Sequence, residues 1–400
     1  MLTVPQETAN QALLNATLYA DLELFEMALE CGADLQSQHL GVNELGLTAL
    51  QRILGASSDK ADISNHIAIT KRLLSYPIDL NKQLHPSPSS YPLFMALTSG
   101  HSELVHLLIE NGAIIWSQGA AGAEMVSWAA RSGMNWFVSR VLQRLSPPYP
   151  NPDEKMKRGL ELALCQAARK GHLEIVEMLI DFGVNVDAGD EYGGGTPIML
   201  AAQEGHLDIA QLLRERNADL LSVGPRGETL LLGAFRGGLL PLANELLSKG
   251  ADPQASNFYN ITALHSVGET HREEMVESLI TAGASLLARD KGDHTVLHSA
   301  AGKGDLELAK ACLEAGEKAD VTDNWGYTPF MNAASHGNIA MMELLVQHGA
   351  NPEHIAHYEG ETALHYAVFG HQKDTIAWLL NRKVKLTNVL ESTNIGEVTP

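Results

Sequence analysis

Histidine is the residue of this chain with the widest chemical use, because an imidazole can bind a metal ion or exchange a proton near neutral pH. The sequence holds 17 histidines but no H-E-x-x-H, no C-x-x-C and no EF-hand loop, so we expect no metal ion. The histidines recur instead in two contexts, three residues after a threonine or beside a glycine. They are His265, His298 and His365 in the first context, and His101, His172, His206, His336 and His371 in the second.

Other patterns that could support catalysis are incomplete. The glycine run at 193–195 could suggest a phosphate-binding loop. Such a loop also needs a lysine and a surrounding β-α-β pattern, and both are missing here. No G-x-S-x-G elbow occurs. Cys31, Cys165 and Cys312 lie far apart and are odd in number, which favours reduced, buried thiols. The sequence therefore nominates no catalytic residue and no cofactor, and favours a chain that is not an enzyme.

The segments that carry these residues repeat along the chain. Six of them begin at a threonine, and successive threonines are 33, 33, 33, 33 and 34 residues apart. A period of about 20–50 residues indicates a solenoid or another repeat array. The six segments begin at Thr196, Thr229, Thr262, Thr295, Thr328 and Thr362.

Each repeated position has a physical role in a helix-turn-helix unit. The threonine hydroxyl can cap the first helix. Paired alanines such as Ala300-Ala301 allow neighbouring helices to approach closely. A glycine then ends this helix, and a pattern such as L-E-I-V-E-M-L gives the second helix an apolar stripe. Stacking of successive units buries these faces in a ribbon-shaped core.

These residues resemble the ankyrin repeat, whose signature is T-P-L-H-x-A, a Gly-His turn and a Gly-Ala-Asp ending. Thr262–His265 matches the opening, Gly171-His172 the turn and Gly250–Asp252 the ending. The resemblance implies an all-α solenoid of helix-turn-helix units with β-turn fingers, curved so that one face is concave. It also implies that the histidines of both contexts form structural hydrogen bonds.

Weaker copies extend the resemblance to about eleven repeats over residues 11–386. We expect an N-terminal lead (1–10), degenerate repeats with insertions (11–157), a regular array (158–386) and a C-terminal tail (387–400). The insertion Ser146–Lys157 contains four prolines, which predict an extended loop.

Repeat proteins of this kind bind partners with their finger tips, which precede each motif threonine by three or four residues. Aromatic residues at exposed turns are the type enriched at binding hot spots. They could equally pack against the neighbouring finger. The tip positions hold Tyr192, Pro225-Arg226, Phe258-Tyr259, Lys291, Trp325 and Tyr358.

The end of each inner helix provides a second candidate surface, on the concave face. Basic residues recur there although the formal charge of the chain is −20. Such a line could bind an acidic or carboxylate-bearing ligand, or it could be a mixed solvated face interrupted by Glu204 and Glu269. The basic positions are Arg131, Arg169, Lys170, Arg236 and Lys303.

Composition excludes several other classes of function. With 28 basic against 48 acidic residues, the chain is not expected to bind nucleic acid or an anionic membrane. No apolar run is long enough to span a membrane, and the first residues lack the pattern of a secretory signal.

The sequence thus favours a scaffold in the cytoplasm or nucleus, monomeric in isolation, that binds another protein, such as one with an acidic segment. The alternative is small-molecule binding or catalysis in a groove pocket near residues 85–170. This region contains Trp128, Trp136 and Cys165, with Arg131 and Arg169 at the expected wall.

Overall fold

The chain folds into two compact units, Met1–Glu191 and Tyr192–Pro400. The expected change from degenerate to regular repeats at residue 158 stays a prediction. The computed structural model describes residues 4–36, 38–39, 43–55, 63–82, 91–116, 119–146, 151–189, 195–356 and 360–382. The expected C-terminal tail lies outside this part of the chain.

The first unit is built from consecutive helix pairs. Its first helix starts at Gln6, within the expected N-terminal lead. A short antiparallel pair of strands, β1 and β2, precedes the third helix. The described elements are α1 (Gln6–Leu18), α2 (Leu22–Glu30), β1 (Gln38–His39), β2 (Asn43–Glu44), α3 (Leu45–Gly55), α4 (Ser64–Leu74), α5 (Pro92–Ser99), α6 (Ser102–Glu110), α7 (Gly119–Arg131), α8 (Asn135–Leu145), α9 (Glu154–Lys170) and α10 (Leu173–Asp181).

The second unit continues the same pattern with shorter first helices. Its described elements are α11 (Pro197–Gln203), α12 (Leu207–Glu215), α13 (Leu230–Arg236), α14 (Leu240–Ser248), α15 (Ala263–Ser266), α16 (Arg272–Thr281), α17 (Val296–Lys303), α18 (Leu306–Glu314), α19 (Pro329–Ser335), α20 (Ile339–Gln347), α21 (Ala363–Phe369) and α22 (Lys373–Asn381).

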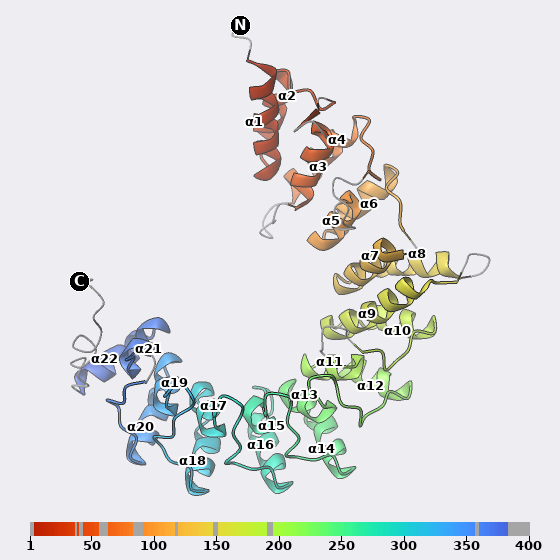
Figure 1. Ribbon diagram of the computed structural model, residues 1–400. Coiled ribbons are helices and arrows are strands. Elements are labelled where there is room, and N and C mark those ends of the chain that lie inside the picture. The colour runs from red at the N-terminus through yellow and green to blue at the C-terminus, as the bar shows by residue number, and fades with distance from the viewer. Residues whose placement is uncertain are drawn as a thin grey trace. The chain divides into compact units, whose positions relative to one another are not determined.

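In both units the odd-numbered helices pack against one another in sequence, from α1 to α9 and from α11 to α21. In the second unit these helices line the inner side of an arc, and the even-numbered helices lie outside them (Figure 1). We call the side formed by the odd-numbered helices of the second unit the inner face. The all-α solenoid expected from the repeats is confirmed.

Close packing of the inner helices depends on small residues. Ala201, Ala202, Ala300 and Ala301 are fully buried, as the alanine pairs predict. At Gly237, the residue that follows α13, a Cβ atom would lie 1.9 Å from the backbone oxygen of Ala202 in α11. Neighbouring inner helices therefore touch backbone to backbone at their C-terminal ends.

The motif threonines begin the inner helices as expected, but their hydroxyl groups do not all act alike. Those of Thr229, Thr295 and Thr328 each accept a hydrogen bond from the backbone N–H three residues on, over 3.3 Å. Thr196 also begins its helix, yet its buried Oγ1 has no hydrogen-bond partner among the described residues.

The expected loop over Ser146–Lys157 is only partly correct, because α9 begins at Glu154. Asp153 caps this helix by accepting a hydrogen bond from Met156 N over 2.7 Å. The prolines of the insertion all precede Asp153, so they do not oppose the helix. None of the helices in the described residues is both apolar and long enough to cross a membrane.

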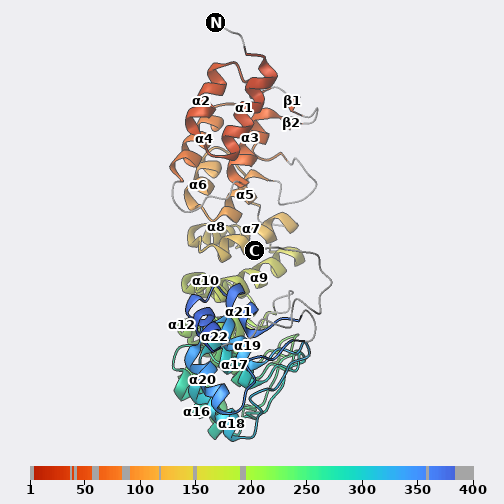
Figure 2. The ribbon, with the colours of Figure 1, turned by 90° about the vertical axis from the view of Figure 1, so that its left-hand side faces the viewer.

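Between the helix pairs of the second unit, the chain forms finger-like turns on one side of the helices (Figure 2). Isolated antiparallel bridges close three of these fingers at their base, between Val223 and Thr229, Ser256 and Thr262, and Arg289 and Thr295. Each of these three fingers therefore ends at the threonine that precedes the next inner helix.

Candidate protein-binding surface

Three fingers of the second unit are tight turns, each held by one side chain. The Oδ1 atoms of Asn257, Asp290 and Asp323 each accept two backbone N–H groups over 2.7–3.1 Å. The donors lie two and four residues further along the chain. Side chains of this kind stabilise a turn locally, so the same tip conformation recurs at the period of the repeat.

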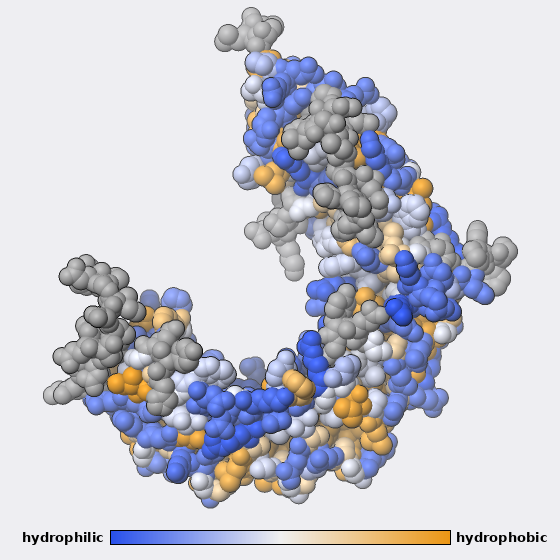
Figure 3. Space-filling model, viewed as in Figure 1, coloured by the Kyte–Doolittle hydropathy of each residue, from blue (hydrophilic) through white to orange (hydrophobic). Residues whose placement is uncertain are grey.

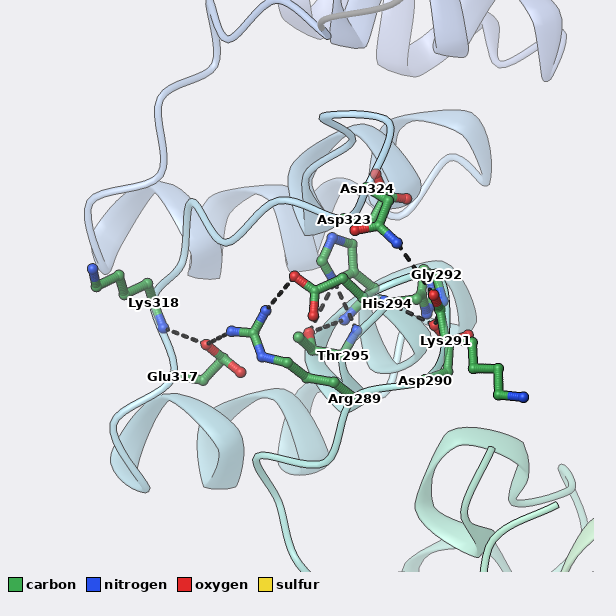
Figure 4. Close-up of polar contacts among 12 residues, drawn as sticks. Arg289, Asp290, Lys291, Gly292, His294, Thr295, Glu317, Lys318, Asp323 and Asn324 are labelled. Atoms are coloured by element: carbon green, nitrogen blue, oxygen red, sulfur yellow. Dashed lines mark hydrogen bonds and ion pairs between the residues drawn. The ribbon is translucent and has the colours of Figure 1, made fainter. Parts of the chain in front are cut away.

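Backbone hydrogen bonds join the neighbouring finger tips. Lys291 N donates to Tyr259 O over 2.8 Å, and Asn324 N donates to Gly292 O over 2.9 Å. The side chain of Asn324 adds a bond to Lys291 O over 3.2 Å, as Figure 4 shows. The tips are therefore fixed relative to one another, which lowers the entropy lost when a partner binds them.

Arg289 ties the base of one finger to the next repeat. Its guanidinium lies 3.1 Å from Asp293 Oδ2 in the same finger and 3.5 Å from Glu317 Oε1, which follows α18 (Figure 4). Glu317 has a side chain only 6% exposed, so this ion pair is better shielded than an ordinary surface pair.

The predicted tip residues are exposed and also contact their neighbours. Phe258, Tyr259 and Trp325 are 63%, 51% and 48% exposed. Lys291 Nζ lies 3.4 Å from the centre of the Phe258 ring, a cation–π contact between adjacent fingers. The Trp325 ring lies over Gly292, where a Cβ atom would be 3.0 Å from it. We call Phe258, Tyr259, Lys291 and Trp325 the tip row.

The rings thus pack on neighbouring fingers and also keep about half of their surface open to solvent, and their role in partner binding stays a prediction. On the face of the second unit in Figure 3, hydrophobic residues form small separate patches beside a hydrophilic field. Exposed aromatic side chains are of the type enriched at binding hot spots. Tyr192 and Tyr358, the other predicted tip aromatics, lie outside the described residues.

The predicted basic residues all end inner helices, where a cation also interacts favourably with the helix dipole. In the first unit, Arg131 ends α7, and Arg169 and Lys170 end α9, the helix that packs on α7. The Arg131 guanidinium lies 5.1 Å from the centre of the Trp128 ring. We call these three residues the basic group.

In the second unit, Arg236 ends α13 and Lys303 ends α17, with the short helix α15 between them. Lys303 contacts the end of that helix, because its Nζ donates to His265 O over 3.3 Å and to Val267 O over 2.8 Å. Burial lowers the pKa of Lys303 to about 8. Because these two hydrogen bonds already occupy the Lys303 amine, a primary role in partner binding is disfavoured.

Helix α15 is short because Val267 and Gly268 replace the usual alanine pair. Val267 is extended, with φ −46° and ψ 130°, which ends the helix after four residues. Gly268 N then donates to Phe235 O of α13 over 3.0 Å. Sequence reasoning missed this interruption, and the signal for it was the glycine in an alanine position.

A pocket of about 340 Å³ opens on the inner face beside the shortened helix. We call it the inner pocket. Its walls come from α11, α13, α15 and α17 and from the bases of three fingers. The lining residues are Met199, Gln203, Glu228, Thr229, Leu232, Gly233, Arg236, Asn257, Ile261, His265, Ser266, Asp290, His294 and Ser299.

The histidines three residues after a threonine have structural hydrogen bonds, as the resemblance implies. His298 Nδ1 lies 2.8 Å from Thr295 Oγ1, and its Nε2 lies 3.0 Å from Tyr327 O in the next finger. His265 makes the same two contacts one repeat earlier. Burial lowers the pKa of His298 to about 3 and also lowers that of His265. In the described residues, no three His, Cys, Asp or Glu side chains are placed to hold a metal ion.

Among the described residues of the alternative region at residues 85–170, the candidate side chains have separate surroundings. Trp136 stacks on His106 at 3.7 Å and donates to Ser102 Oγ over 2.9 Å. Cys165 is buried and donates to Ala188 O. The pocket of about 630 Å³ in this unit is lined by residues 145–185, and none of the tryptophans or basic residues predicted for a pocket line it.

Comparison with known proteins gives the same classification as the geometry. A family model for ankyrin repeats matches in three copies, at residues 126–223, 230–318 and 297–389. The repeats expected before residue 126 stay a prediction.

Three relatives share this type of sequence. The mouse B-cell lymphoma 3 protein homolog is 27% identical over 210 residues, covering 51% of this chain and 46% of the relative. The chicken nuclear factor NF-kappa-B p105 subunit is 30% identical over 227 residues, covering 53% and 23%. Ankyrin repeat and KH domain-containing protein mask-1 of Caenorhabditis elegans is 28% identical over 232 residues, covering 58% and 8%. The chain spans less than half the length of each, and by its repeats and its fold it belongs to the ankyrin repeat family.

Proposed function

We propose that the chain is a protein–protein interaction scaffold, without catalysis of its own, that binds a partner through its inner face and its finger tips. The tip row is the observation that carries this proposal. Three aromatic side chains stand about half exposed on turns that hydrogen bonds already fix. A rigid aromatic patch loses little entropy on binding and gains a large apolar contact.

The basic group of Arg131, Arg169 and Lys170 favours a partner with an acidic segment. Three cations at the ends of two adjacent helices form a local positive field in a chain whose formal charge is −20. Such a field accelerates and orients association with an acidic surface. We propose the same role for Arg236, which ends an inner helix of the second unit. Lys303 is retained only as a minor contributor, because its amine is hydrogen-bonded within the fold.

We further infer that the scaffold acts in the cytoplasm or the nucleus and is monomeric in isolation. The large negative charge supports the monomer, because like-charged copies repel one another at low ionic strength. Sedimentation velocity at low and moderate salt measures this directly. A dimer at micromolar concentration in both conditions would contradict it.

Affinity capture with matched variants tests the proposed binding surface. The tip variant combines Phe258→Ser with Trp325→Ser, and its control is Tyr19→Ser, which changes an aromatic side chain 76% exposed in the first unit. We expect the tip variant to lose specific partners that wild type and the control retain. Thermal unfolding of all three must be equal, since loss of binding in proportion to loss of stability would refute the assignment.

A second bait tests the basic positions. The variant Arg131→Glu, Arg169→Glu, Arg236→Glu should lose the same partners, and raised salt should weaken capture by wild type. Capture that is unaffected by charge reversal but lost with the tip variant would move the binding surface to the tip row alone. If the wild-type bait captured no specific protein, that result would contradict the scaffold proposal.

A further inference from the structure

A groove with an apolar part opens on the outer side of the second unit, where helices α16 and α18 lie next to each other (Figure 1). Its volume is about 260 Å³, and we call it the outer groove. The apolar residues that line it are Val276 and Ile280 from α16 and Ala311 from α18. Val276 is buried, whereas Ile280 is 37% exposed. The outer groove therefore offers apolar surface to a partner on the side away from the inner face.

The corresponding groove two repeats earlier, between α12 and α14, is bridged by an ion pair. Arg214 Nη1 lies 2.6 Å from Glu245 Oε2, and the space beside them measures only about 60 Å³. Two periods of 33 residues lead from Arg214 to Ile280 and from Glu245 to Ala311. Two apolar residues thus replace the ion pair in the outer groove. This replacement explains why the outer groove is the wider of the two and has an apolar part.

The charged residues that line the outer groove are all acidic. Glu273 and Glu277 lie one turn apart on α16, both are exposed, and neither has an ion-pair partner among the described residues. Glu307 pairs with Lys310 over 2.7 Å, and Asp305 accepts the capping hydrogen bond of α18. Like charges one turn apart oppose each other on a helix. Cations of a partner would therefore be drawn to the two carboxylates of α16.

We propose that the outer groove binds a helix of a protein partner that carries two basic residues one turn apart and an apolar residue one turn beyond them. The basic residues meet Glu273 and Glu277, and the apolar residue packs on Ile280 and Ala311. Positions 273, 277 and 280 share one face of α16 and span about 10 Å, a spacing that a second helix laid along the groove can match. This site is separate from the inner face and the tip row, and it selects a basic segment instead of an acidic one.

A peptide titration on the full chain tests the outer groove. The probe is an alanine-based helical peptide with two arginines one turn apart and a leucine one turn beyond them. The control peptide has the same composition, with the leucine moved to the opposite face of the helix. The chain carries ¹³C-methyl isoleucine, and Ile280→Val identifies the signal of Ile280. We expect a saturable shift of this signal with the probe and about tenfold weaker binding of the control. The absence of a saturable shift, or equal affinity for both peptides, would overturn the proposal.

A matched pair of charge variants locates the arginines of the probe. Glu277→Gln should weaken binding about threefold, because one cation loses its partner. Glu274→Gln is the control, since Glu274 is an exposed carboxylate of the same helix that lies outside the lining of the outer groove. It should leave the affinity unchanged. Equal weakening by the two variants would show a general charge effect and overturn the assignment to this groove.

A double variant tests the apolar part of the groove. Ile280→Arg combined with Ala311→Glu copies the ion pair of the earlier repeat, and it should abolish binding of the probe with thermal unfolding unchanged. Binding that persists in this variant would overturn the proposal, and if the variant unfolds more easily the comparison of Glu277→Gln with Glu274→Gln decides. The tip variant, Phe258→Ser with Trp325→Ser, should bind the probe as wild type does. Failure of the outer groove is therefore distinguishable from failure of the proposed scaffold surface, which protein capture tests.

Discussion

Helix α17 should lose stability in mild acid because of one buried histidine. His298 is fully buried and its pKa is lowered from 6.5 to about 3 by burial. Its Nδ1 accepts a hydrogen bond from Thr295 N over 3.2 Å, so a proton on Nδ1 would remove an acceptor. Between pH 6.5 and 3 the unfolded segment binds a proton that the folded one excludes. The free energy of unfolding therefore falls as the pH falls across this interval.

The size of this effect follows from the two pKa values. At pH 5 the unfolded imidazole is 1.5 pH units below its ordinary pKa of 6.5, while the folded one remains neutral. At about 1.4 kcal/mol per unit, opening of this segment becomes easier by about 2 kcal/mol between neutral pH and pH 5. This corresponds to about a thirtyfold loss of protection against amide hydrogen exchange, after correction for intrinsic rates.

The variant His298→Met isolates this contribution, because a methionine occupies the same motif position at Met199 and Met331. We expect hydrogen exchange of α17 peptides to show the thirtyfold loss in wild type, and a much smaller change with pH in the variant. Other histidines contribute equally to both proteins and cancel. An equal loss of protection in both, or an NMR titration that protonates the His298 ring near pH 6.5, would refute the reasoning.

Three further predictions follow from close contacts and burial. Gly237→Ala should lower the free energy of unfolding in urea by about 2 kcal/mol or more, because its Cβ would meet a carbonyl oxygen of α11 at 1.9 Å. Gly302→Ala is the control, since its Cβ has room, and it should be neutral or stabilising in the same measurement. Lys303→Met removes the donor to the carbonyl oxygens of His265 and Val267, so hydrogen exchange in α15 and the following residues should become about tenfold faster. Exchange in α20 should stay unchanged. Cys31 is exposed, so the expectation of a buried thiol is wrong for this residue, and it should react with a thiol reagent at pH 8 in the folded chain. Cys312 should not react, because burial raises its pKa to about 12.

The solenoid and its repeat period could be predicted from the sequence because each motif residue acts locally. A threonine caps the helix that follows it, and an alanine pair sets the distance between neighbouring helices, whatever the rest of the chain does. The exposed tips at Phe258 and Trp325 could be predicted for the same reason, since their place in the turn follows from the period alone.

The inner pocket and the role of Lys303 could not be predicted in this way. Both depend on how Val267 and Gly268 fold, and that conformation is stabilised by bonds from two neighbouring repeats. A long, flexible lysine at a helix end fits equally well a solvated face, a partner contact or an internal hydrogen bond. Only the position of the carbonyl oxygens of the preceding repeat decides between them.

The interruption at α15 also has a mechanical consequence. In a linear array, each repeat is stabilised mainly by its two neighbours, so cooperativity passes along the chain through their shared interfaces. With only four helical residues, α15 offers less surface to α13 and α17 than the other inner helices of the second unit. We expect tension applied along this unit to divide it here first, into a block before α15 and a block after it.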